Sequence, residues 1–282
     1  MVDGIQLEEA RSMNLKQKIV QHYDELSPYY RDLWGVHIHH GYWKSGAETK
    51  EEAQEQLIRE LVSRAGIQNG ARILDVGCGL GGAAIYLNKA LGAKVTGITI
   101  SSTQIEMAKE LVRNSGAEVR LVLMDAEALE MDERFDVVWS VEAISHLNEK
   151  ARCFVSIQRL LQPGGTLVIA DWFKSSTATA TEQSQYLKPI ERAMLLPQLE
   201  CPSAYAGYIR QAGLNVTVFE DLSANVRRTW DLAIEVIGKP ALWKFAAARG
   251  RDFLGFLQGF AAMKAGYQSK ALVYGALIAK KL

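Results

Sequence analysis

The chain has 282 residues, of which 48% are hydrophobic and 23% charged, and its 32 basic and 32 acidic residues balance to a formal net charge of zero. This composition is typical of a globular protein with one large domain, and the zero charge argues against a nucleic-acid partner, which a basic surface would attract. Three cysteines without C-x-x-C spacing, no apolar run of membrane-spanning length and an acidic amino terminus predict a cytoplasmic enzyme.

The chain is predicted to begin with a helical cap over residues 1–65. Apolar residues at helical spacing predict one or two helices over 8–33, with a break at Pro28. An aromatic and histidine-rich loop, 34–43, follows, and 49–64 has the pattern of an amphipathic helix.

Strands and helices then alternate over residues 66–175. Short apolar runs predict parallel strands at 73–76, 94–101, 119–124, 135–140 and 166–170, with helices at 82–91, 102–114 and 150–161. Such repeats predict an open sheet that is covered by helices on both faces and binds ligands beyond the carboxyl ends of its strands.

The alternation stops at Ser175. We expect helices over 185–198 and 204–212, a strand over 215–219, a long aromatic helical region over 222–263 and a closing strand over 270–279. Aromatic side chains in this last third, with Lys and Arg interspersed, would line an apolar pocket and allow at most a peripheral contact with a membrane.

A glycine-rich turn, Asp75-Val76-Gly77-Cys78-Gly79-Leu80-Gly81-Gly82, links the first of the parallel strands to its helix. Its G-x-G-x-x-G spacing also fits a dinucleotide site, but no acidic residue ends the next strand, and Asp75 would repel a pyrophosphate. A carboxylate suits the sulfonium and ammonium groups of S-adenosylmethionine (SAM). Charge therefore favours SAM over a nicotinamide cofactor.

A series of motifs then follows in a fixed order. The glycine turn, Asp125-Ala126, the run 135–138 and Leu161-x-Pro163-Gly164-Gly165 resemble the motifs of class I SAM-dependent methyltransferases. From Tyr23-Asp24 to the tail at 264–281, the chain resembles the tocopherol O-methyltransferase-like family of small-molecule methyltransferases. This resemblance implies a single α/β domain with a doubly wound, seven-stranded Rossmann-like sheet whose last strand is antiparallel. The cap is expected at 1–65, the SAM-binding core at 66–175, and the substrate lid helices with the closing strands at 176–282.

The resemblance also implies cofactor contacts. Asp75 and the glycine backbone would hold the methionine part of SAM, Thr99 and Gln104 the ribose hydroxyls, and Asp125 the adenine amino group. Gln104 has a simpler alternative role in capping its helix. The full predicted set is Tyr23, Asp75, Gly77, Gly79, Gly81, Thr99, Ser101, Gln104, Asp125, Ala126 and Ser140.

His146 is the predicted base, because histidine titrates near neutral pH. It follows Glu142 by four residues, so the two could share a helical face, and Asp171 is the expected acidic partner by analogy with natural-product O-methyltransferases. The alternative is a surface histidine that caps a helix.

Residues expected to face the substrate are His37, His39, His40, Trp43 and Tyr186. The three histidines of the loop could ligate zinc, but no fourth ligand has a known spacing, so no metal site is predicted.

Together these features predict a SAM-dependent methyltransferase that releases S-adenosylhomocysteine (SAH). Its substrate would be a hydrophobic, aromatic small molecule of phenol, prenylquinol or natural-product type, as in secondary metabolism. The alternatives are N-methylation of an alkaloid-type amine, a non-methylating reaction such as cyclisation on the same fold, and a nicotinamide-dependent oxidoreductase. The methylated atom and the oligomeric state stay open.

Overall fold

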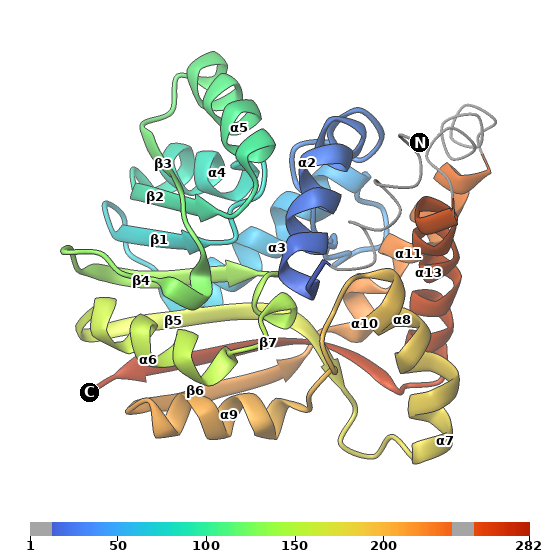
Figure 1. The fold of residues 1–282 in the computed structure, drawn as a ribbon. Helices are drawn as coiled ribbons and strands as arrows, with labels where there is room; N and C mark the ends of the chain where they lie inside the picture. Colours follow the sequence, from blue (N-terminus) through green and yellow to red (C-terminus); the bar gives the residue numbers. More distant parts are fainter. Residues whose placement is uncertain (1–12, 239–250) are drawn as a thin grey trace.

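The computed structural model describes residues 13–238 and 251–282. Seven strands form one sheet in the order β3-β2-β1-β4-β5-β7-β6, and β7 runs antiparallel to both of its neighbours (Figure 1). The strands are β1 (Arg72–Val76), β2 (Lys94–Thr99), β3 (Val119–Leu123), β4 (Phe135–Val141), β5 (Leu161–Lys174), β6 (Leu214–Asp221) and β7 (Leu272–Lys281). The predicted doubly wound sheet with an antiparallel last strand is confirmed.

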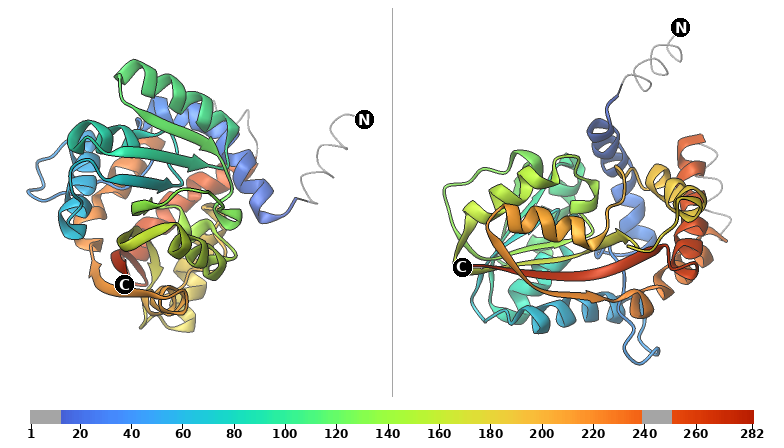
Figure 2. Two further views of the ribbon diagram at one scale, coloured as in Figure 1. Left: turned by 90° about the vertical axis from the view of Figure 1, so that its left-hand side faces the viewer. Right: turned by 90° about the horizontal axis from the view of Figure 1, so that it is seen from below.

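Helices cover both faces of this sheet and the carboxyl ends of its parallel strands (Figures 1 and 2). The α-helices are α2 (Leu15–Leu33), α3 (Lys50–Ala65), α4 (Gly82–Leu91), α5 (Ser102–Ser115), α6 (Lys150–Leu160), α7 (Ala180–Glu182), α8 (Lys188–Ala193), α9 (Pro202–Gln211), α10 (Ser223–Val226), α11 (Arg228–Ile237) and α13 (Arg251–Gln268). The shorter turns are η1 (Ala126–Ala128), η2 (Ile144–His146) and the π-helical η3 (Gln183–Leu187). None of the helices in the described ranges combines the length and the apolarity that crossing a membrane requires.

Four predicted elements differ from the structure. Within the described residues 13–33 the chain forms one helix, α2, which continues through Pro28, where a break was predicted, because its buried face packs on the core at Ile19 and Leu26 and outweighs the lost backbone bond. The helix predicted over 185–198 is divided into η3 and α8 and ends at Ala193. The region predicted as one long helix is divided into α10, α11 and α13, and its residues 239–250, with Trp243 and Phe245, lie outside the described residues. The strand predicted to end at 170 continues to Lys174 because it pairs with β7 along that length.

The pleat of the sheet separates two hydrophobic clusters. Val168, Ala170 and Trp172 of β5 belong to the cluster that includes α3, α4 and the lid helices, whereas Leu167, Ile169 and Phe173 belong to the cluster under α6 and α9. Figure 2 shows α9 and α3 on opposite sides of the sheet. Since successive side chains of a strand point to opposite faces, the position of a residue in β5 decides which of these compartments it reaches.

Candidate active site

Two adjoining cavities lie beyond the carboxyl ends of the parallel strands. The strand-end cavity, of about 110 Å³, borders the ends of β1, β2 and β4. The aromatic cavity, of about 140 Å³, lies among α2, α11 and α13. Four residues line both of them, and these are Tyr23, Ile38, Glu142 and His146. A group bound in one cavity therefore meets a group bound in the other at these four side chains.

The glycine turn forms one edge of the strand-end cavity. Gly77 and Gly79 line it with φ angles of 81° and 53°, in the left-handed region that favours glycine. A Cβ on Gly77 would also lie 2.3 Å from the Cβ of Ala143. Only glycine therefore lets the backbone of β1 approach the turn after β4 so closely.

Most of the predicted cofactor residues meet at this cavity. Those that line it are Tyr23, Gly77, Gly79, Thr99, Gln104, Asp125 and Ala126. The Thr99 hydroxyl donates to Gln104 Oε1 at 2.7 Å. The structure thus brings together, from four separate elements, polar groups suited to a ribose and an adenine.

Four predicted cofactor residues do not line the cavity. Ser101 caps α5 and donates to Asp24 Oδ1 at 2.5 Å, and Ser140 donates to the Val76 carbonyl at 3.0 Å. Gly81 is the N-cap of α4. Ser101, Ser140 and Gly81 therefore stabilise the local fold through helix capping and backbone hydrogen bonds.

Asp75, the fourth of these residues, is a buried acid with an unused oxygen. It is 3% exposed, burial raises its pKa to about 7, and its Oδ2 has no hydrogen-bond partner among the described residues. An unpaired buried carboxylate is costly unless a cation neutralises it. This observation fits the ammonium group of SAM, so the residues present suit that cofactor.

Helix α2 covers the strand-end cavity with Lys16, Ile19 and Tyr23, which lie on one face of the helix. Lys16 Nζ is 2.7 Å from Asp125 Oδ2 and also pairs with Glu127. Lys16 and Glu127 were not predicted from the sequence, because nothing local indicates which face of α2 meets η1.

His146 lies at the boundary in a defined tautomer. Its Nδ1 is 3.3 Å from the Leu195 carbonyl, which only accepts, so Nδ1 carries the proton. Nε2 is then an acceptor and receives a bond from the Tyr23 hydroxyl at 3.2 Å. Burial lowers the pKa of His146 to about 4, so the ring is neutral near pH 7. Leu195 was not predicted from the sequence, because it acts through its backbone carbonyl, which every residue type has.

Glu142 does not share a helical face with His146, contrary to the prediction. Its φ is 54°, and η2 begins only at Ile144, so its side chain turns towards the loop after α2. Glu142 Oε1 accepts from the backbone N–H of His40 at 2.7 Å, from its Nδ1 at 3.0 Å and from the Tyr274 hydroxyl at 2.9 Å. These bonds to His40 keep the pKa of Glu142 low although burial alone would raise it.

Asp171 is not the hydrogen-bonding partner of His146. It lies within β5 on the face that points to α6 and α9, and it is fully buried there. Its oxygens accept from the backbone N–H groups of Ser145 and Trp172, each at 2.8 Å. The expected pairing of Asp171 with His146 is wrong because β5 continues past Asp171. The pleat of the strand therefore sets the direction of the Asp171 side chain. Its contact with Ser145 still supports the turn that carries His146.

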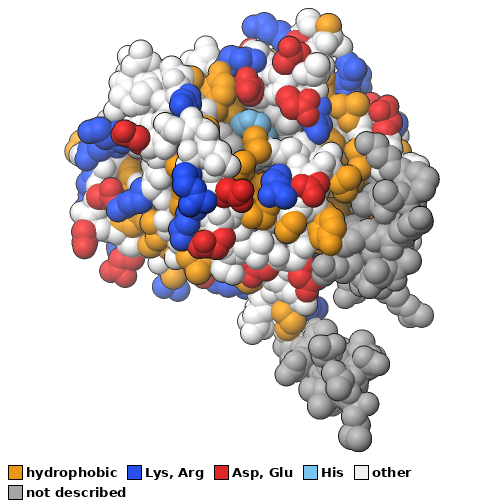
Figure 3. Space-filling model, turned by 90° about the horizontal axis from the view of Figure 1, so that it is seen from above, with side chains coloured by type: hydrophobic (Ala, Val, Ile, Leu, Met, Phe, Trp, Pro, Cys, Tyr) orange, Lys and Arg blue, Asp and Glu red, His pale blue; other side chains and the backbone are white. Residues whose placement is uncertain are grey.

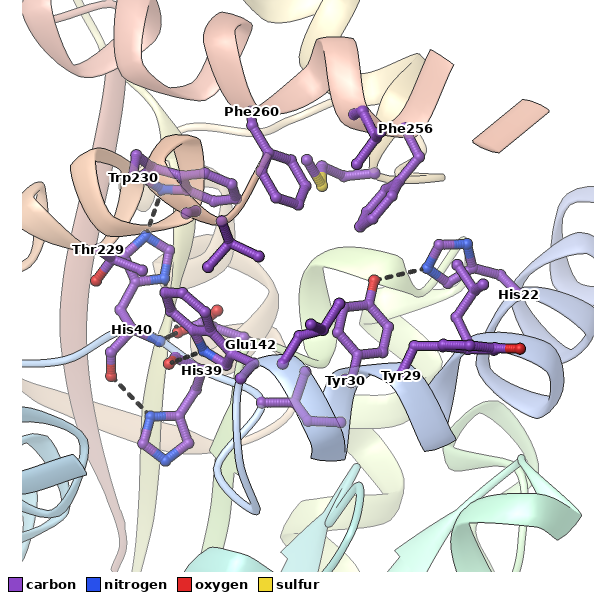
Figure 4. Close-up of a pocket in the computed structure, with 18 of the residues that line it drawn as sticks. His22, Tyr29, Tyr30, His39, His40, Glu142, Thr229, Trp230, Phe256 and Phe260 are labelled. Atoms are coloured by element: carbon purple, nitrogen blue, oxygen red, sulfur yellow. Dashed lines mark hydrogen bonds and ion pairs between the residues drawn. The ribbon is translucent and has the colours of Figure 1, made fainter. Parts of the chain in front are cut away.

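The aromatic cavity is walled by rings from three helices (Figure 4). Tyr30 of α2 points towards His22, whose Nε2 lies 2.9 Å from its hydroxyl. Phe260 of α13 packs edge-on against Trp230 of α11, with ring centroids 5.3 Å apart. The enclosed space is therefore mainly apolar and fits a flat or branched hydrophobic molecule.

Of the predicted substrate residues, His39 and His40 line the aromatic cavity, but His37, Trp43 and Tyr186 line neither cavity. Trp43 instead donates to the Glu48 carbonyl at 3.1 Å and lies under the guanidinium of Arg228. Among the described residues, no group of three or more His, Cys, Asp or Glu side chains is arranged to hold a metal ion.

The face of the molecule seen from above carries interspersed acidic and basic side chains (Figure 3). A histidine is visible among hydrophobic side chains on this face. This mixture of charges agrees with the zero net charge of the sequence.

Comparisons with known proteins agree with this geometry. The model of the mycolic acid cyclopropane synthetase family matches residues 11–239. The chain is 30% identical over 266 residues to 27-O-demethylrifamycin SV methyltransferase of Amycolatopsis mediterranei, across 92% of this chain and 95% of the relative. It is 27% identical over 290 residues to the chloroplastic tocopherol O-methyltransferase of Arabidopsis thaliana, across 95% and 82%.

Solved structures have the same fold. The [4+2]-cyclase SpnF aligns with a TM-score of 0.77 and 26% identity over 94% of this chain and 95% of its own. The mycolic acid cyclopropane synthase CmaA1, complexed with SAH and CTAB, aligns with a TM-score of 0.78 and 20% identity over 93% and 97%. The chain belongs to the mycolic acid cyclopropane synthetase family and is a SAM-dependent methyltransferase with small-molecule O-methyltransferases among its relatives.

Proposed function

We propose that this enzyme transfers a methyl group to a hydroxyl of a hydrophobic, aromatic small molecule, with His146 as the base. The observation that carries this proposal is the position of His146, which lines both cavities and presents an unprotonated Nε2 at their boundary. A cofactor in the strand-end cavity and an acceptor in the aromatic cavity would meet at this nitrogen.

The strand-end cavity is the proposed SAM site. The backbone of Gly77 and Gly79 would contact the methionine part of SAM. Thr99 and Gln104 would bond the ribose hydroxyls, and Asp125 with the Ala126 backbone would recognise the adenine. Asp75 supplies the negative charge for the ammonium group. When bound there, SAM supplies the methyl group and leaves as SAH.

The protein's own contribution is orientation, exclusion of water and one proton transfer. The acceptor hydroxyl donates to His146 Nε2, in the place that the Tyr23 hydroxyl takes in the structure. As the acceptor oxygen bonds to the methyl carbon, the hydroxyl proton moves to Nε2 of His146. The Leu195 carbonyl continues to accept from Nδ1–H and stabilises the resulting imidazolium.

The aromatic cavity supports a hydrophobic acceptor of phenol, prenylquinol or natural-product type, because rings of α2, α11 and α13 form most of its wall. The relatives named for methylation of 27-O-demethylrifamycin SV and of tocopherol support an oxygen acceptor. An amine acceptor is the second candidate, favoured by the Glu142 carboxylate that lines the same aromatic wall. Cyclisation without methyl transfer is the third, favoured by the likeness to SpnF.

The test is transfer of labelled methyl from SAM to a panel of phenols, prenylated quinols, hydroxylated polyketides and tertiary amines. Replacing His146 by Gln should lower kcat by about 10² to 10⁴ and leave the affinity for SAH within a few-fold. Gln56→Leu is the control, because this residue lines neither cavity and its amide bonds to neighbouring side chains of α3. Full activity of the His146 variant would contradict the base assignment, and product formation without SAM consumption would favour cyclisation.

A further inference from the structure

The segment 36–43, here called the strap, builds the boundary between the two cavities without regular secondary structure. Its Ile38 lines both cavities, and its His40 reaches Glu142 and accepts from the indole N–H of Trp230 at 2.8 Å. An irregular segment keeps one conformation only if other parts of the protein bind its backbone.

The carboxyl-terminal half of the strap is held by backbone bonds to several other elements. Gly41 N–H donates to Thr229 Oγ1 at 3.1 Å, Tyr42 N–H to the Ala53 carbonyl at 2.7 Å, and Trp43 N–H to the Asn225 carbonyl at 3.0 Å. Together with the bond from the His40 N–H to Glu142, these bonds hold the backbone from His40 onward, so the position of Ile38 depends on the backbone groups of its neighbours His37 and His39.

Gln54 of α3 binds both of these neighbours, and the Trp34 indole adds a longer contact of 3.5 Å to the His39 carbonyl. The Gln54 side chain is almost fully buried, and its Nε2 donates to the His37 carbonyl at 2.5 Å and to the His39 carbonyl at 3.2 Å. Carbonyls only accept, so these two bonds use both hydrogens of one amide group. A carboxylate or an aliphatic side chain at position 54 cannot make either bond.

The two carbonyls flank Ile38, so Gln54 fixes the register of the strap. The rings of His37 and His39 lie on one side, with centroids 5.3 Å apart. Figure 4 shows the His39 ring directed away from that of His40, which points to Trp230. A slip by one residue would exchange these sides and move Ile38 out of the boundary.

We infer that Gln54 is a positioning residue for methyl transfer, which acts through the strap and contacts neither cavity. It holds Ile38 as the wall between cofactor and acceptor and holds His40 within reach of Glu142. This inference rests on the proposed function only in the identity of the two ligands.

The test compares Gln54→Leu and Gln54→Glu with Gln56→Leu, a control on the same helix whose amide bonds only to neighbouring side chains of that helix. SAH affinity is measured by calorimetry, and methyl transfer from SAM to 1-naphthol is followed in single turnovers at saturation. Both Gln54 variants should bind SAH within about threefold of the unmodified enzyme. Their transfer rate should fall by about 100-fold, the usual effect of a misplacement of about 1 Å. Gln56→Leu should keep the full rate.

Hydrogen exchange provides a readout that does not need activity. Backbone amides of residues 37–41 should exchange faster in Gln54→Leu than in Gln56→Leu, with α3 itself unchanged. An unchanged transfer rate with unchanged exchange would overturn the inference. So would a loss of SAH binding in proportion to a loss of folded protein, because it would indicate a structural role alone. If the unmodified enzyme methylates neither 1-naphthol nor any other acceptor, the proposed function fails and the exchange result alone decides the role of Gln54.

Discussion

Burial sets the protonation states around the two cavities, residue by residue. It lowers the pKa of His146 to about 4 and that of His37 to about 3, and it raises the pKa of Asp75 and of Asp171 to about 7. In each case desolvation of the charged form is the largest cause. The histidines are therefore neutral at physiological pH, whereas the two acids titrate in that range.

The pH dependence of methyl transfer should reflect the lowered pKa of His146. A base must be unprotonated, and His146 loses this form only below about pH 4 instead of below its ordinary value of 6.5. At saturating SAM, single-turnover rates at pH 5.5 and 7.5 should agree within about twofold, apart from ionisation of the acceptor itself. An acceptor whose ionisation lies outside this range provides the control, and a tenfold loss at pH 5.5 with it would contradict the prediction.

Asp75 should destabilise the ligand-free protein as the pH rises. Its folded pKa is raised from 3.8 to about 7, so its favourable contribution is complete below pH 4 and is lost as the pH rises through 7. Asp75→Asn stays neutral throughout. The variant should therefore gain stability over the unmodified protein as the pH rises from 5 to 8, by at most about 2.7 kcal/mol, because two pH units lie between 5 and the folded pKa.

Thermal unfolding at the two pH values, without ligand, measures this difference. The same variant should bind SAH more weakly at pH 8, since it lacks the charge for the ammonium group. A stability difference that stays constant between pH 5 and 8 would show that Asp75 is not the titrating group.

Among the elements, α2 joins the cap to the core at two places. Asp24 Oδ1 accepts from the Thr103 backbone N–H at 3.0 Å, at the start of α5, where a negative charge is also favoured by the helix dipole. Lys16 pairs with Asp125 at the other side of the strand-end cavity. The helix that covers the strand-end cavity is thus held by polar contacts at its first and third turns.

Removing the Asp24 contact should loosen this cover. Asp24→Ala should cost about 1 kcal/mol of stability, as for the loss of a helix cap, and raise the Kd for SAH several-fold because Tyr23 and Ile19 line the cavity beside it. Asp32→Ala is the matched control on α2, since that exposed carboxylate pairs only with Arg31. Equal effects of the two variants on SAH binding would argue against the role of Asp24.

The end of β4 differs most from the structure predicted for it. A spacing of four residues suggested one helical face for Glu142 and His146, but the left-handed backbone at Glu142 and the short turn η2 separate their directions. The two side chains still line the same boundary. They reach it with different partners, Glu142 with His40 and His146 with Leu195.

For the whole molecule, cofactor binding should appear as added stability. A ligand that binds only the folded state at 100 times its Kd adds about 2.7 kcal/mol, which corresponds to about 5–10 °C for a protein of this size. SAH should produce this shift and NAD should not. A shift with NAD alone would contradict the assignment of the strand-end cavity.

The sequence by itself determined the features that depend on local pattern. Alternating apolar runs indicated the sheet, the order of motifs identified a class I methyltransferase, and Gly77, Gly79, Thr99 and Asp125 were expected at or just after strand ends, where they line one cavity. These predictions succeeded because strand, turn and helix are each encoded within about ten residues, and parallel strands place their carboxyl ends at one edge.

Only the tertiary structure decided which side chains meet across long sequence distances. Lys16 meets Asp125, Gln54 holds the strap, and the Leu195 carbonyl fixes the tautomer of His146. The pleat and length of β5 turned Asp171 away from the role expected for it. Such contacts depend on the rotation of each helix, the register of each strand and the path of each loop, and these are set by packing of the whole core, which no local pattern encodes.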